Sequence, residues 1–398
     1  MPKSQYEDLI LLPELRWGKF HRPSRASWHY HCQKISAFEV CPKCATPSAC
    51  VYDHRNVKIK DAPIRGKGVW LIIRKRRFWC NPCNKPFTEP IQGILPKKRT
   101  TQRYRRSILW ACENFSDLKQ VQRAYRCSAD FIYRVLYEQL ERKRKRLLCP
   151  WPKTIGIDEH HFRRHPKGQW REFATTVIDY NRKCIKEVVA GKSILDLKTD
   201  LAYIPGKENV KNVICDLADP YKTFAKEFFP NAKVIADKFH VLRLLHPPIN
   251  KERKNITGDK RTLPIRKLLL KDSRKINWEI RKGIWIWLEK YPKLKELYHY
   301  KEALHRFYRI KGYERAKQVL QKILDQMANS TLKEIKRLRY TLLRWRQEIL
   351  NYFKTRLTNG RTEGFNNRAK LIKRRAYGYK NFNNYRLRLL NACNGLRF

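Results

Sequence analysis

Residues 210–237 read VKNVICDLADPYKTFAKEFFPNAKVIAD, and this stretch decides the fold. Its apolar start, Val210 to Cys215, is short and continuous, which is typical of a buried strand. The residues from Tyr221 to Phe229 carry apolar side chains at helical spacing, and Lys233 to Ala236 form a second short apolar run. The pattern therefore predicts a strand, a helix and a second strand.

Three further strands are predicted upstream, at Thr154 to Asp158, Trp170 to Ile178 and Ile185 to Ala190. Two tight turns separate them, so we expect the three strands to be antiparallel neighbours. A helix from Ser193 to Tyr203 follows. The resulting order of three strands, helix, strand, helix and strand is that of an RNase H-like fold.

Beyond His240 the sequence pattern becomes almost wholly helical. One stretch has an apolar stripe at helical spacing, made by Ala316, Val319, Leu320, Ile323, Leu324 and Met327. We therefore predict that residues 241–354 are an all-helical insertion, which divides an RNase H-like domain into residues 152–240 and residues 355–398. The tryptophans of the insertion are expected to be core residues rather than base-stacking platforms: Trp285, Trp287 and Trp345.

Three acidic residues stand out by their positions on these elements. Asp158 closes the first predicted strand, and Asp216 directly follows the fourth. These two strands lie side by side in an RNase H-like sheet, so both carboxylates are expected at one edge. Glu363 lies on the helical segment TEGFNNRAK and can complete the site. Three carboxylates suit the hard Mg²⁺ ion, and two ions about 3.5 to 4 Å apart assist phosphodiester chemistry.

Alternative interpretations of these acids remain open. An aspartate at the end of a strand is often only a helix N-cap or a turn residue. Asp219 competes with Asp216, although the pair Asp219-Pro220 looks like the start of a helix. Glu159, His160 and His161 crowd Asp158 and offer an alternative set of ligands for a transition metal.

The chain has 89 basic and 36 acidic residues among 398, which gives a formal net charge of +53. Solubility requires far less charge, so a polyanionic partner is implied, and nucleic acid is the first candidate. No apolar stretch approaches the ~20 residues of a membrane-spanning helix, and the N-terminus lacks the apolar core of a signal peptide. We therefore expect a cytoplasmic protein without a membrane partner, whose paired cysteines are metal ligands.

Two CxxC motifs, at residues 41–44 and 80–83, predict a small metal-pinned β module over residues 41–95. Together they can supply four thiolates to one structural Zn²⁺: Cys41, Cys44, Cys80 and Cys83. Three nearby residues are substitute ligands: Cys32, Cys50 and His54. Residues 1–40 carry little pattern and are expected to be a basic arm with one short helix.

Residues 100–147 are predicted to form a helix-turn-helix. Helical periodicity begins at Thr100, a second helix is expected from Asp117 to Tyr125, and a third is expected from Ser128 to Leu140. The third helix is expected to present four residues to DNA: Tyr133, Arg134, Arg142 and Arg144. Basic residues after Glu363 are expected to hold the substrate backbone: Arg368, Lys370, Lys373, Arg374 and Arg375. A basic helix face can alternatively be merely solvated.

Three segments, IGIDEHHFRR (155–164), ICDLADPYKTFAKEFFPNAKVIADKFHVL (214–242) and NGRTEGFNNRAKLIKRRAYGYKNF (359–382), resemble the ISL3 family of bacterial insertion-sequence transposases. The resemblance also includes the cysteine module, hence most of the chain after residue 40. It implies a DDE triad of Asp158, Asp216 and Glu363 and an accessory Asp-x-x-His signature at Asp237 and His240. The last two side chains can alternatively form an ordinary structural hydrogen bond.

On this interpretation the chain is a multidomain α+β protein and a DNA transposase that uses two Mg²⁺ or Mn²⁺ ions and a structural Zn²⁺. It hydrolyses a phosphodiester at the terminal inverted repeats of an insertion sequence, and the freed 3′-hydroxyl then attacks target DNA. The resemblance also implies a dimer or larger assembly on DNA, located at the bacterial nucleoid when bound. Two rival functions are a non-catalytic zinc-finger and helix-turn-helix regulator, and an RNase H-like structure-selective nuclease that cuts without joining.

Overall fold

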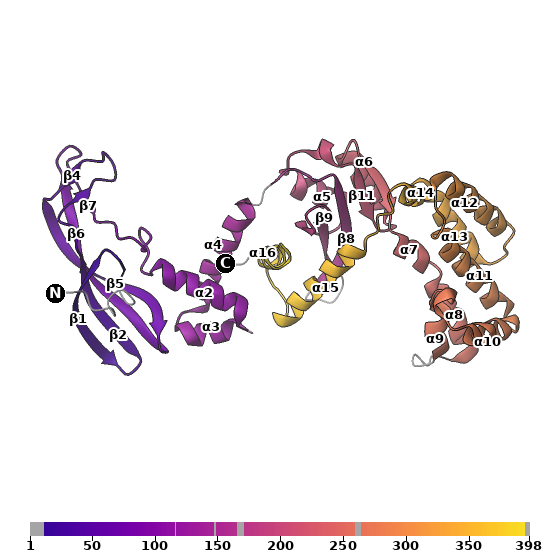
Figure 1. Ribbon diagram of the computed structural model, residues 1–398, viewed down its shortest axis with the longest axis horizontal. Coiled ribbons are helices and arrows are strands. Elements are labelled where there is room, and N and C mark those ends of the chain that lie inside the picture. The colour runs from indigo at the N-terminus through magenta and orange to yellow at the C-terminus, as the bar shows by residue number, and fades with distance from the viewer. Residues whose placement is uncertain (1–11, 116, 147–148, 165–170, 259–263, 395–398) are drawn as a thin grey trace. The chain divides into compact units, whose positions relative to one another are not determined.

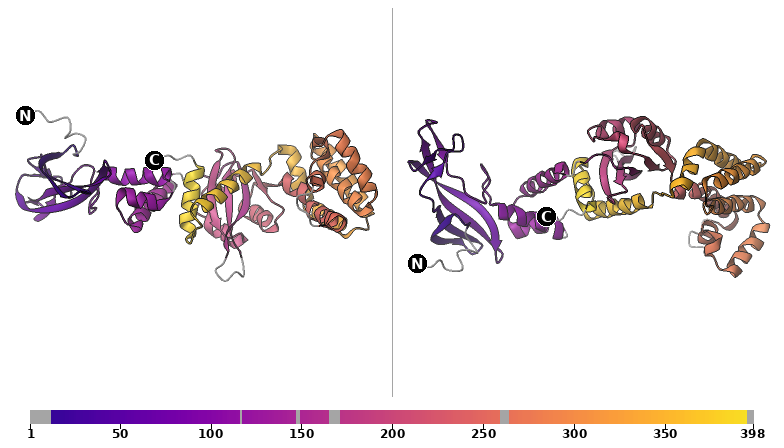
Figure 2. Two further views of the ribbon diagram at one scale, coloured as in Figure 1. Left: turned by 90° about the horizontal axis from the view of Figure 1, so that it is seen from below. Right: turned by 45° about the horizontal axis from the view of Figure 1, so that its top comes forward.

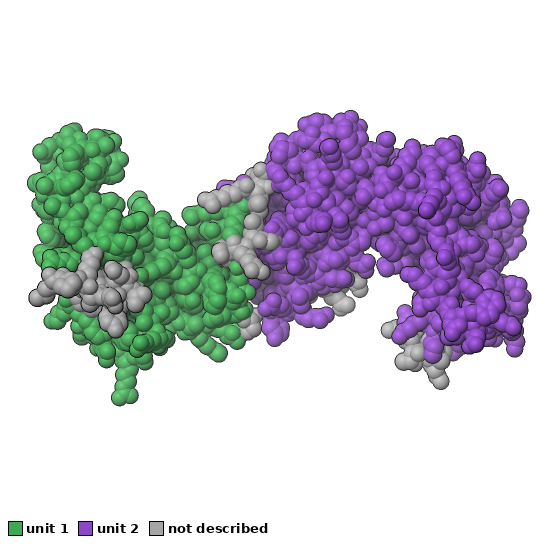
Figure 3. Space-filling view, viewed as in Figure 1, with its two compact units in different colours: residues 1–143, 396–398 green, residues 144–395 purple. Residues whose placement is uncertain are grey.

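The computed structural model of the protein describes residues 12–115, 117–146, 149–164, 171–258 and 264–394 (Figure 1). The chain divides into two compact units, one of residues 1–143 with 396–398 and the other of residues 144–395 (Figure 3). Each unit has a β-sheet and helices of its own (Figure 2). Among the described residues, no helix is long and apolar enough to cross a lipid bilayer.

The first unit is built on a five-stranded sheet. Its strands are β1 (Leu15–Ser24), β2 (Ser27–Lys34), β5 (Val51–Ile64), β6 (Lys67–Cys80) and β7 (Lys85–Thr88). They lie in the order β1-β2-β6-β5, with β7 beside the end of β6, and only the β2–β6 pair is parallel. A separate two-stranded sheet, β3 (Glu39–Val40) with β4 (Pro47–Ser48), lies in the cysteine region.

The prediction of a basic arm with a short helix over residues 1–40 is wrong for β1 and β2. Trp28, Tyr30 and Cys32 alternate with polar residues along β2 and pack in the core of the sheet. This alternation with a period of two is the signature of a strand with one buried face. This strand is hard to recognise in the sequence because its polar positions are His29, His31 and Gln33, whose side chains are aromatic or amphipathic.

Three helices follow the sheet, namely α2 (Gln102–Asn114), α3 (Leu118–Tyr125) and α4 (Ala129–Arg146). The side chains of Thr101 and Asp117 accept hydrogen bonds from backbone N–H groups in the first turns of α2 and α3, which fixes where these helices begin. The three predicted helices are therefore present, and α4 runs further than expected.

The second unit contains another five-stranded sheet. Its order is β10 (Cys184–Ala190), β9 (Arg171–Asp179), β8 (Thr154–Arg164), β11 (Asn212–Cys215) and β12 (Lys233–Ala236). The first three strands are antiparallel to one another, whereas β8, β11 and β12 are parallel. The predicted order of strands and helices is observed, but β8 extends past Asp158 because its pairing with β9 continues to Arg164.

Helices cover both faces of this sheet. Val188 packs with residues of α15 (Gly360–Arg375) and α16 (Phe382–Cys393), whereas its neighbour Val189 packs with residues of α5 (Ile194–Leu201) and α6 (Asp219–Phe228). Successive strand residues point to opposite faces, so the two helix pairs lie on opposite sides of the sheet. Figure 1 shows α15 running beside β8.

The chain between β12 and α15 forms helices in its described part. They are α7 (Lys238–Arg243), α8 (His246–Thr257), α9 (Pro264–Leu270), α10 (Trp278–Glu289), α11 (Pro292–Phe307), α12 (Tyr313–Ala328), α13 (Lys333–Arg344) and α14 (Arg346–Thr355). A short 3₁₀ turn, Ser273–Lys275, lies between α9 and α10, and another, Lys207–Asn209, lies outside this segment, between α5 and β11. Trp345 is buried, and Trp285 and Trp287 pack against the same core, as expected of core residues. The last helix, α14, packs against β12.

Candidate active site

The register of two parallel strands brings Asp158 and Asp216 together. Ile157 of β8 lies opposite Cys215 of β11, and the parallel pairing ends there. The next residues, Asp158 and Asp216, therefore lie at the same level along the two strands. The carboxylate oxygens of Asp158, Glu159 and Asp216 lie within 4.8 Å of one another. The sequence suggested that Asp158 ends its strand, whereas β8 continues to Arg164. Asp158 nevertheless follows the last parallel pair and lies at the expected edge.

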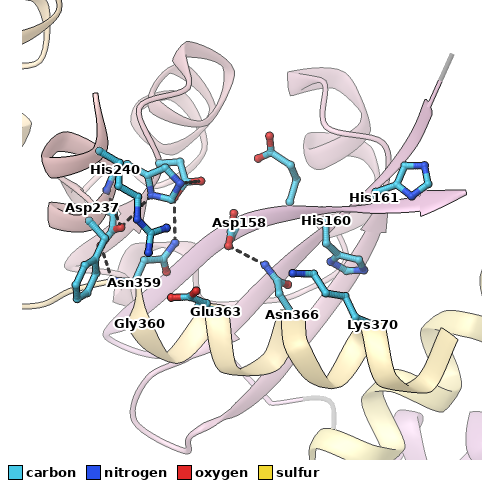
Figure 4. A pocket seen from close by; sticks show the side chains of 14 residues that line it. Asp158, His160, His161, Asp237, His240, Asn359, Gly360, Glu363, Asn366 and Lys370 are labelled. Atoms are coloured by element: carbon cyan, nitrogen blue, oxygen red, sulfur yellow. Dashed lines mark hydrogen bonds and ion pairs between the residues drawn. The ribbon is translucent and has the colours of Figure 1, made fainter. Parts of the chain in front are cut away.

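Glu363 approaches the same place from the first turn of α15. Figure 4 shows Glu363 and Asn366 on the side of this helix that faces β8, with Asp158 opposite them. Glu363 is exposed and is not part of the tight group of aspartates. One pocket nevertheless contains all three predicted catalytic residues, and its lining includes Asp158, Asp216, Asp237, His240, Asn359, Glu363, Asn366 and Lys370.

Asn359 fixes the start of α15 against the sheet. Its side-chain amide donates hydrogen bonds to the carbonyl oxygen of Ile157 (3.2 Å) and to Oδ1 of Asp216 (3.4 Å). Its side-chain oxygen accepts hydrogen bonds from the hydroxyls of Thr362 and Tyr180. A buried asparagine thus links both aspartate-bearing strands to the helix that carries Glu363.

Gly156 allows this close approach. A Cβ atom at this position would lie 2.6 Å from the Tyr180 ring and 2.9 Å from the Thr362 hydroxyl. Real Cβ atoms do not come so near to other heavy atoms, so any larger residue would push the start of α15 away from β8.

Asn366 holds Asp158 directly. Its Nδ2 donates a hydrogen bond of 2.7 Å to Oδ2 of Asp158. Asn359 and Asn366 were not predicted to belong to the site. Their spacing could have indicated it, because residues four before and three after Glu363 share one helical face with it.

His240 lies between two carboxylates. Its Nε2 is 2.9 Å from Oδ2 of Asp216, and its Nδ1 is 2.9 Å from Oδ2 of Asp237. Burial disfavours the charged ring, but hydrogen bonds to Asp216 and Asp237 outweigh it and raise the pKa of His240 to about 10. The expected hydrogen bond within the Asp-x-x-His signature is present, and the contact with Asp216 connects it to the acidic cluster.

The cluster has the electrostatics of a cation site. Burial and the neighbouring carboxylate of Asp216 raise the pKa of Asp158 to about 8. Like charges held this close disfavour ionisation unless a cation compensates them. The donor set of Asp158, Glu159 and Asp216 contains only oxygen atoms, which fits a hard divalent cation.

The alternatives left open by the sequence are less consistent with the structure. His160 lines the pocket, but both of its ring nitrogens are engaged, one by the hydroxyl of Tyr385 and the other by Thr176 at 3.3 Å, so neither is available as a metal ligand. Asp219 is the first residue of α6 and pairs with Arg344 at 2.6 Å. Asp219 therefore has the structural role of a helix start.

The four cysteines of the CxxC motifs converge in the first unit. One sulfur atom from each of Cys41, Cys44, Cys80 and Cys83 lies within 4.8 Å of the others. Hydrogen bonds from the side chain and backbone of Thr46 lower the pKa of Cys44 to about 6, which favours the thiolate that a metal requires. Four sulfur ligands in this arrangement fit a structural zinc ion.

The substitute ligands do not join this group. Cys32 is buried in the core of the five-stranded sheet, and neither Cys50 nor His54 belongs to the cluster among the described residues. The predicted set of four cysteines is therefore the set that the fold brings together.

The predicted DNA-contacting residues of α4 differ in their surroundings. Tyr133 and Arg142 are exposed, and Arg134 forms an ion pair of 2.5 Å with Asp130 one turn earlier. Arg144 lies 3.7 Å from the buried carboxylate of Glu187. Arg144 therefore has a structural partner, whereas the other three residues are on the surface.

The basic residues of α15 also separate into two groups. Lys370 lines the acidic pocket, and Arg374 and Arg375 are exposed. Lys373 instead donates hydrogen bonds to the backbone carbonyls of residues 161 and 162. Arg368 is exposed and donates a hydrogen bond of 3.2 Å to the carbonyl of residue 392. The side chain of Lys373 thus points into the fold rather than toward a substrate, contrary to the expectation from the sequence.

Comparison with known proteins agrees with this site. Residues 155–389 match the family model of DDE transposases of the ISL3 type, described as a transposase, and residues 37–83 match that of the zinc finger of transposases IS204, IS1001, IS1096 and IS1165. The chain is 23% identical over 368 residues to a transposase for insertion sequence element IS1001 of Bordetella parapertussis, with 89% of each chain covered. It is 24% identical over 259 residues to a transposase for IS1557 of Mycobacterium tuberculosis, with 57% of each chain covered.

The matched region contains the three acidic residues of the pocket that were predicted to be catalytic, and the zinc-finger match contains all four cysteines of the cluster. The family model covers more than half of the chain. The protein therefore belongs to the ISL3 family of DDE transposases, enzymes that cleave and transfer DNA strands with the help of divalent metal ions.

Proposed function

We propose that Asp158, Asp216 and Glu363 are the metal-binding triad of this transposase and that they hold two Mg²⁺ or Mn²⁺ ions. The single observation that carries the proposal is convergence: residues from β8, from the end of β11 and from α15 line one pocket. The aspartates already share a site, and the exposed side chain of Glu363 lines the same pocket. Magnesium is favoured over zinc because the aspartate cluster offers oxygen ligands.

The proposed reaction is hydrolysis at the ends of an insertion sequence, followed by attack of the freed 3′-hydroxyl on target DNA. Bound divalent ions supply activation of the attacking oxygen and stabilisation of the leaving oxygen. The carboxylates of the triad bind and orient these ions, and the protein forms no covalent intermediate. Lys370, which lines the pocket, lies where it can hold a substrate phosphate.

Asp237 and His240 are proposed as positioning residues for Asp216. The protonated ring of His240 bridges the two aspartates, so it orients one oxygen of Asp216 and balances part of the negative charge. The other oxygen of Asp216 accepts the long hydrogen bond of 3.4 Å from Asn359 and has a second lone pair for the metal site.

We further propose that residues 152–240 and 355–398 form one RNase H-like domain and that residues 241–354 are a helical insertion in it. The strand order β10-β9-β8-β11-β12 and the helices α7 to α14 support this division. Helices α2 to α4 are proposed to be a helix-turn-helix, in which the exposed Tyr133, Arg134 and Arg142 contact duplex DNA. On α15, Arg368, Arg374 and Arg375 are proposed to contact the substrate backbone.

The active form on DNA is proposed to be a dimer or a larger assembly. Transposition joins two ends of one element to a target, so two active sites must act on the same DNA molecule. The net charge of +53 supports assembly on DNA, because phosphates would screen the repulsion between two copies.

The decisive experiment measures Mg²⁺-dependent cleavage of duplexes that carry candidate element ends, with the wild type, Asp216→Asn and the control Asp219→Asn. We expect cleavage by the wild type and the control and none by Asp216→Asn, while all three proteins bind DNA equally. Equal cleavage by Asp216→Asn would overturn the triad. A plasmid assay for strand transfer then tests the nuclease alternative, because a simple nuclease yields cut DNA without joined products.

A further inference from the structure

The five-stranded sheet of the first unit has one face that is not covered by its core. On the other face, Val69, Leu71 and Ile73 of β6 are buried in the core. The strand pairing assigns the residues between them, and those opposite them on β1, β2 and β5, to the uncovered face. We call this surface the open face, and it consists of Arg16, His21, His29, His31, Gln33, His54, Asn56, Lys58, Lys60, Trp70, Ile72 and Arg74.

The open face is cationic and has no acidic residue. It carries two lysines, two arginines and four histidines, and none of its members is buried. Both aspartates of the strands lie on the opposite face, where each has a partner: Asp53 binds Arg77 at 2.7 Å, and Asp61 binds Arg103 at 2.8 Å. The pairing of strands has thus placed both aspartates on one side of the sheet. On the other side, Arg76, which lies opposite His54, has a carboxylate partner of its own in Glu89 at 2.8 Å.

Lys58 and Lys60 lie above an aromatic ring instead of beside a carboxylate. Their Nζ atoms are 4.5 and 5.4 Å from the centre of the Trp70 ring. Among the described residues, no ion pair includes Lys58, Lys60 or Arg74. A ring contact holds an ammonium group in place without neutralising it. Lys60 also donates a hydrogen bond to the backbone carbonyl of Arg126, so the charge of Lys58 is the more available to a partner.

The charges on this face already act on one another. Burial and the charges of Lys58, His21 and His31 lower the pKa of His29. The positive charge of Lys58 on β5 is therefore close enough to act on a side chain of β2. A polyanion lowers the electrostatic repulsion on such a surface, because its negative charges lie between the positive side chains.

We infer that the open face binds the phosphate backbone of duplex DNA. This inference rests on the proposed function, since DNA is the polyanion on which a transposase acts. The surface spans several strands, which lie about 4.8 Å apart, so Lys58 and Arg74 contact different phosphates rather than one small anion. Contacts to phosphates position the protein on DNA without selecting a sequence.

Hydrogen bonds join the five-stranded sheet to the start of α2. The backbone N–H of Lys60 donates to the carbonyl of Arg99, and that of Thr101 donates to the carbonyl of Lys60. The buried carboxylate of Asp61 accepts hydrogen bonds from Thr101 and Arg103 at the start of α2. The open face and the proposed helix-turn-helix therefore belong to one compact unit, and the open face would be a second DNA contact.

The experiment compares the full-length variants Lys58→Gln, Arg74→Gln and Arg55→Gln. Arg55 is the matched control, because it is exposed on the same strand as Lys58 but on the opposite face. Binding of duplex DNA is measured over a range of salt concentrations. We expect Lys58→Gln and Arg74→Gln each to reduce the slope of log K against log salt by about one, and Arg55→Gln to leave it unchanged.

Two further outcomes separate backbone binding from other roles. The loss of affinity should be equal for element ends and for an unrelated duplex, and a loss confined to one sequence would overturn backbone contact. Unchanged salt slopes would also overturn the inference, and altered self-association of the same variants would then identify a protein interface. Zinc content and thermal midpoint confirm that each variant is folded. Metal-dependent cleavage at saturating DNA tests the triad separately, because these variants should keep it.

Discussion

The backbone N–H of Asn359 donates a hydrogen bond of 2.8 Å to Oδ1 of Asp237, a residue that precedes it by 122 positions. The chain leaves the sheet after Asp237 and returns at Asn359, so this bond joins the two ends of a long helical segment. Asp237 also orients His240, and Asn359 also contacts Asp216. The pair of Asp237 and Asn359 thus links the ends of the helical segment α7 to α14 to the acidic cluster.

Replacing the side chain of Asn359 should affect both stability and cleavage. Asn359→Ala removes donors to Ile157 and Asp216 and leaves buried polar groups unsatisfied, so we expect the free energy of unfolding to fall by about 1–3 kcal/mol. Denaturant titration measures this loss. Asn383→Ala, at an exposed position of α16, is the control and should change neither property. Wild-type stability of Asn359→Ala would refute the linking role.

The hydrogen bond from Asn366 to Asp158 should tune metal binding. Asn366→Ala frees Oδ2 of Asp158 to rotate away, and loss of such a supporting contact typically weakens metal binding about 10- to 100-fold. The measurement is the Mg²⁺ concentration that gives half-maximal cleavage. Asn367→Ala, at the exposed neighbouring position, should keep the wild-type value. The same Mg²⁺ dependence in both variants would show that Asp158 does not need this contact.

Zinc content should depend on the four clustered cysteines alone. Cys41→Ser removes one of the four sulfur ligands, so we expect the purified protein to lose its zinc, because a structural site needs its complete set. Elemental analysis measures zinc per chain. Cys50→Ser is the matched control, since Cys50 is exposed and lies outside the cluster. Loss of zinc from the control would mean that the cluster is not the binding site.

An ion-pair group between α6 and α14 should make stability depend on pH. The carboxylate of Glu348 is buried and lies 2.9 Å from Lys222 and 3.0 Å from Lys226. Burial opposes ionisation, but hydrogen bonds from the two lysines outweigh it and lower the pKa of Glu348 below its ordinary 4.5. This stabilisation is fully present above pH 4.5 and is lost as the pH falls through the lower folded pKa.

Glu348→Gln tests this dependence. We expect the variant to be less stable than the wild type by about 1–3 kcal/mol at pH 7, and the difference should shrink at about pH 3, where the wild-type carboxyl becomes protonated. Denaturant titrations at the two pH values give the comparison. Glu314→Gln, at an exposed position of α12, should show no such trend. A difference that is independent of pH would contradict the role of the charge.

Local patterns were sufficient to predict much of this molecule. The strands around Asp158 and Asp216 begin with short apolar runs, so their order and the meeting of the two aspartates followed from the sequence, although β8 continues past Asp158 to Arg164. The paired cysteines were predictable for the same reason, because each CxxC motif is a local unit. Long-range pairing was not: the β2–β6 pair is parallel and joins segments about 40 residues apart, and no local pattern specifies that partner.

The supporting contacts of the site were also beyond local patterns. Asn359 and Asn366 acquire their roles only when α15 packs on the sheet, and many surface asparagines look the same in a sequence. Lys373 shows the opposite error. It belongs to a run of basic residues and was expected on the surface, but its ammonium group caps backbone carbonyls of β8.

The hydrogen bonds from Thr101 and Arg103 to Asp61 have a consequence for how the protein binds DNA. These hydrogen bonds join the sheet to the start of α2, so the proposed DNA contacts of the sheet and of α4 belong to one compact unit. A duplex would have to be long enough to reach both surfaces before it gains both sets of phosphate contacts. The length of the duplex, rather than its sequence, would then set how many of these contacts form.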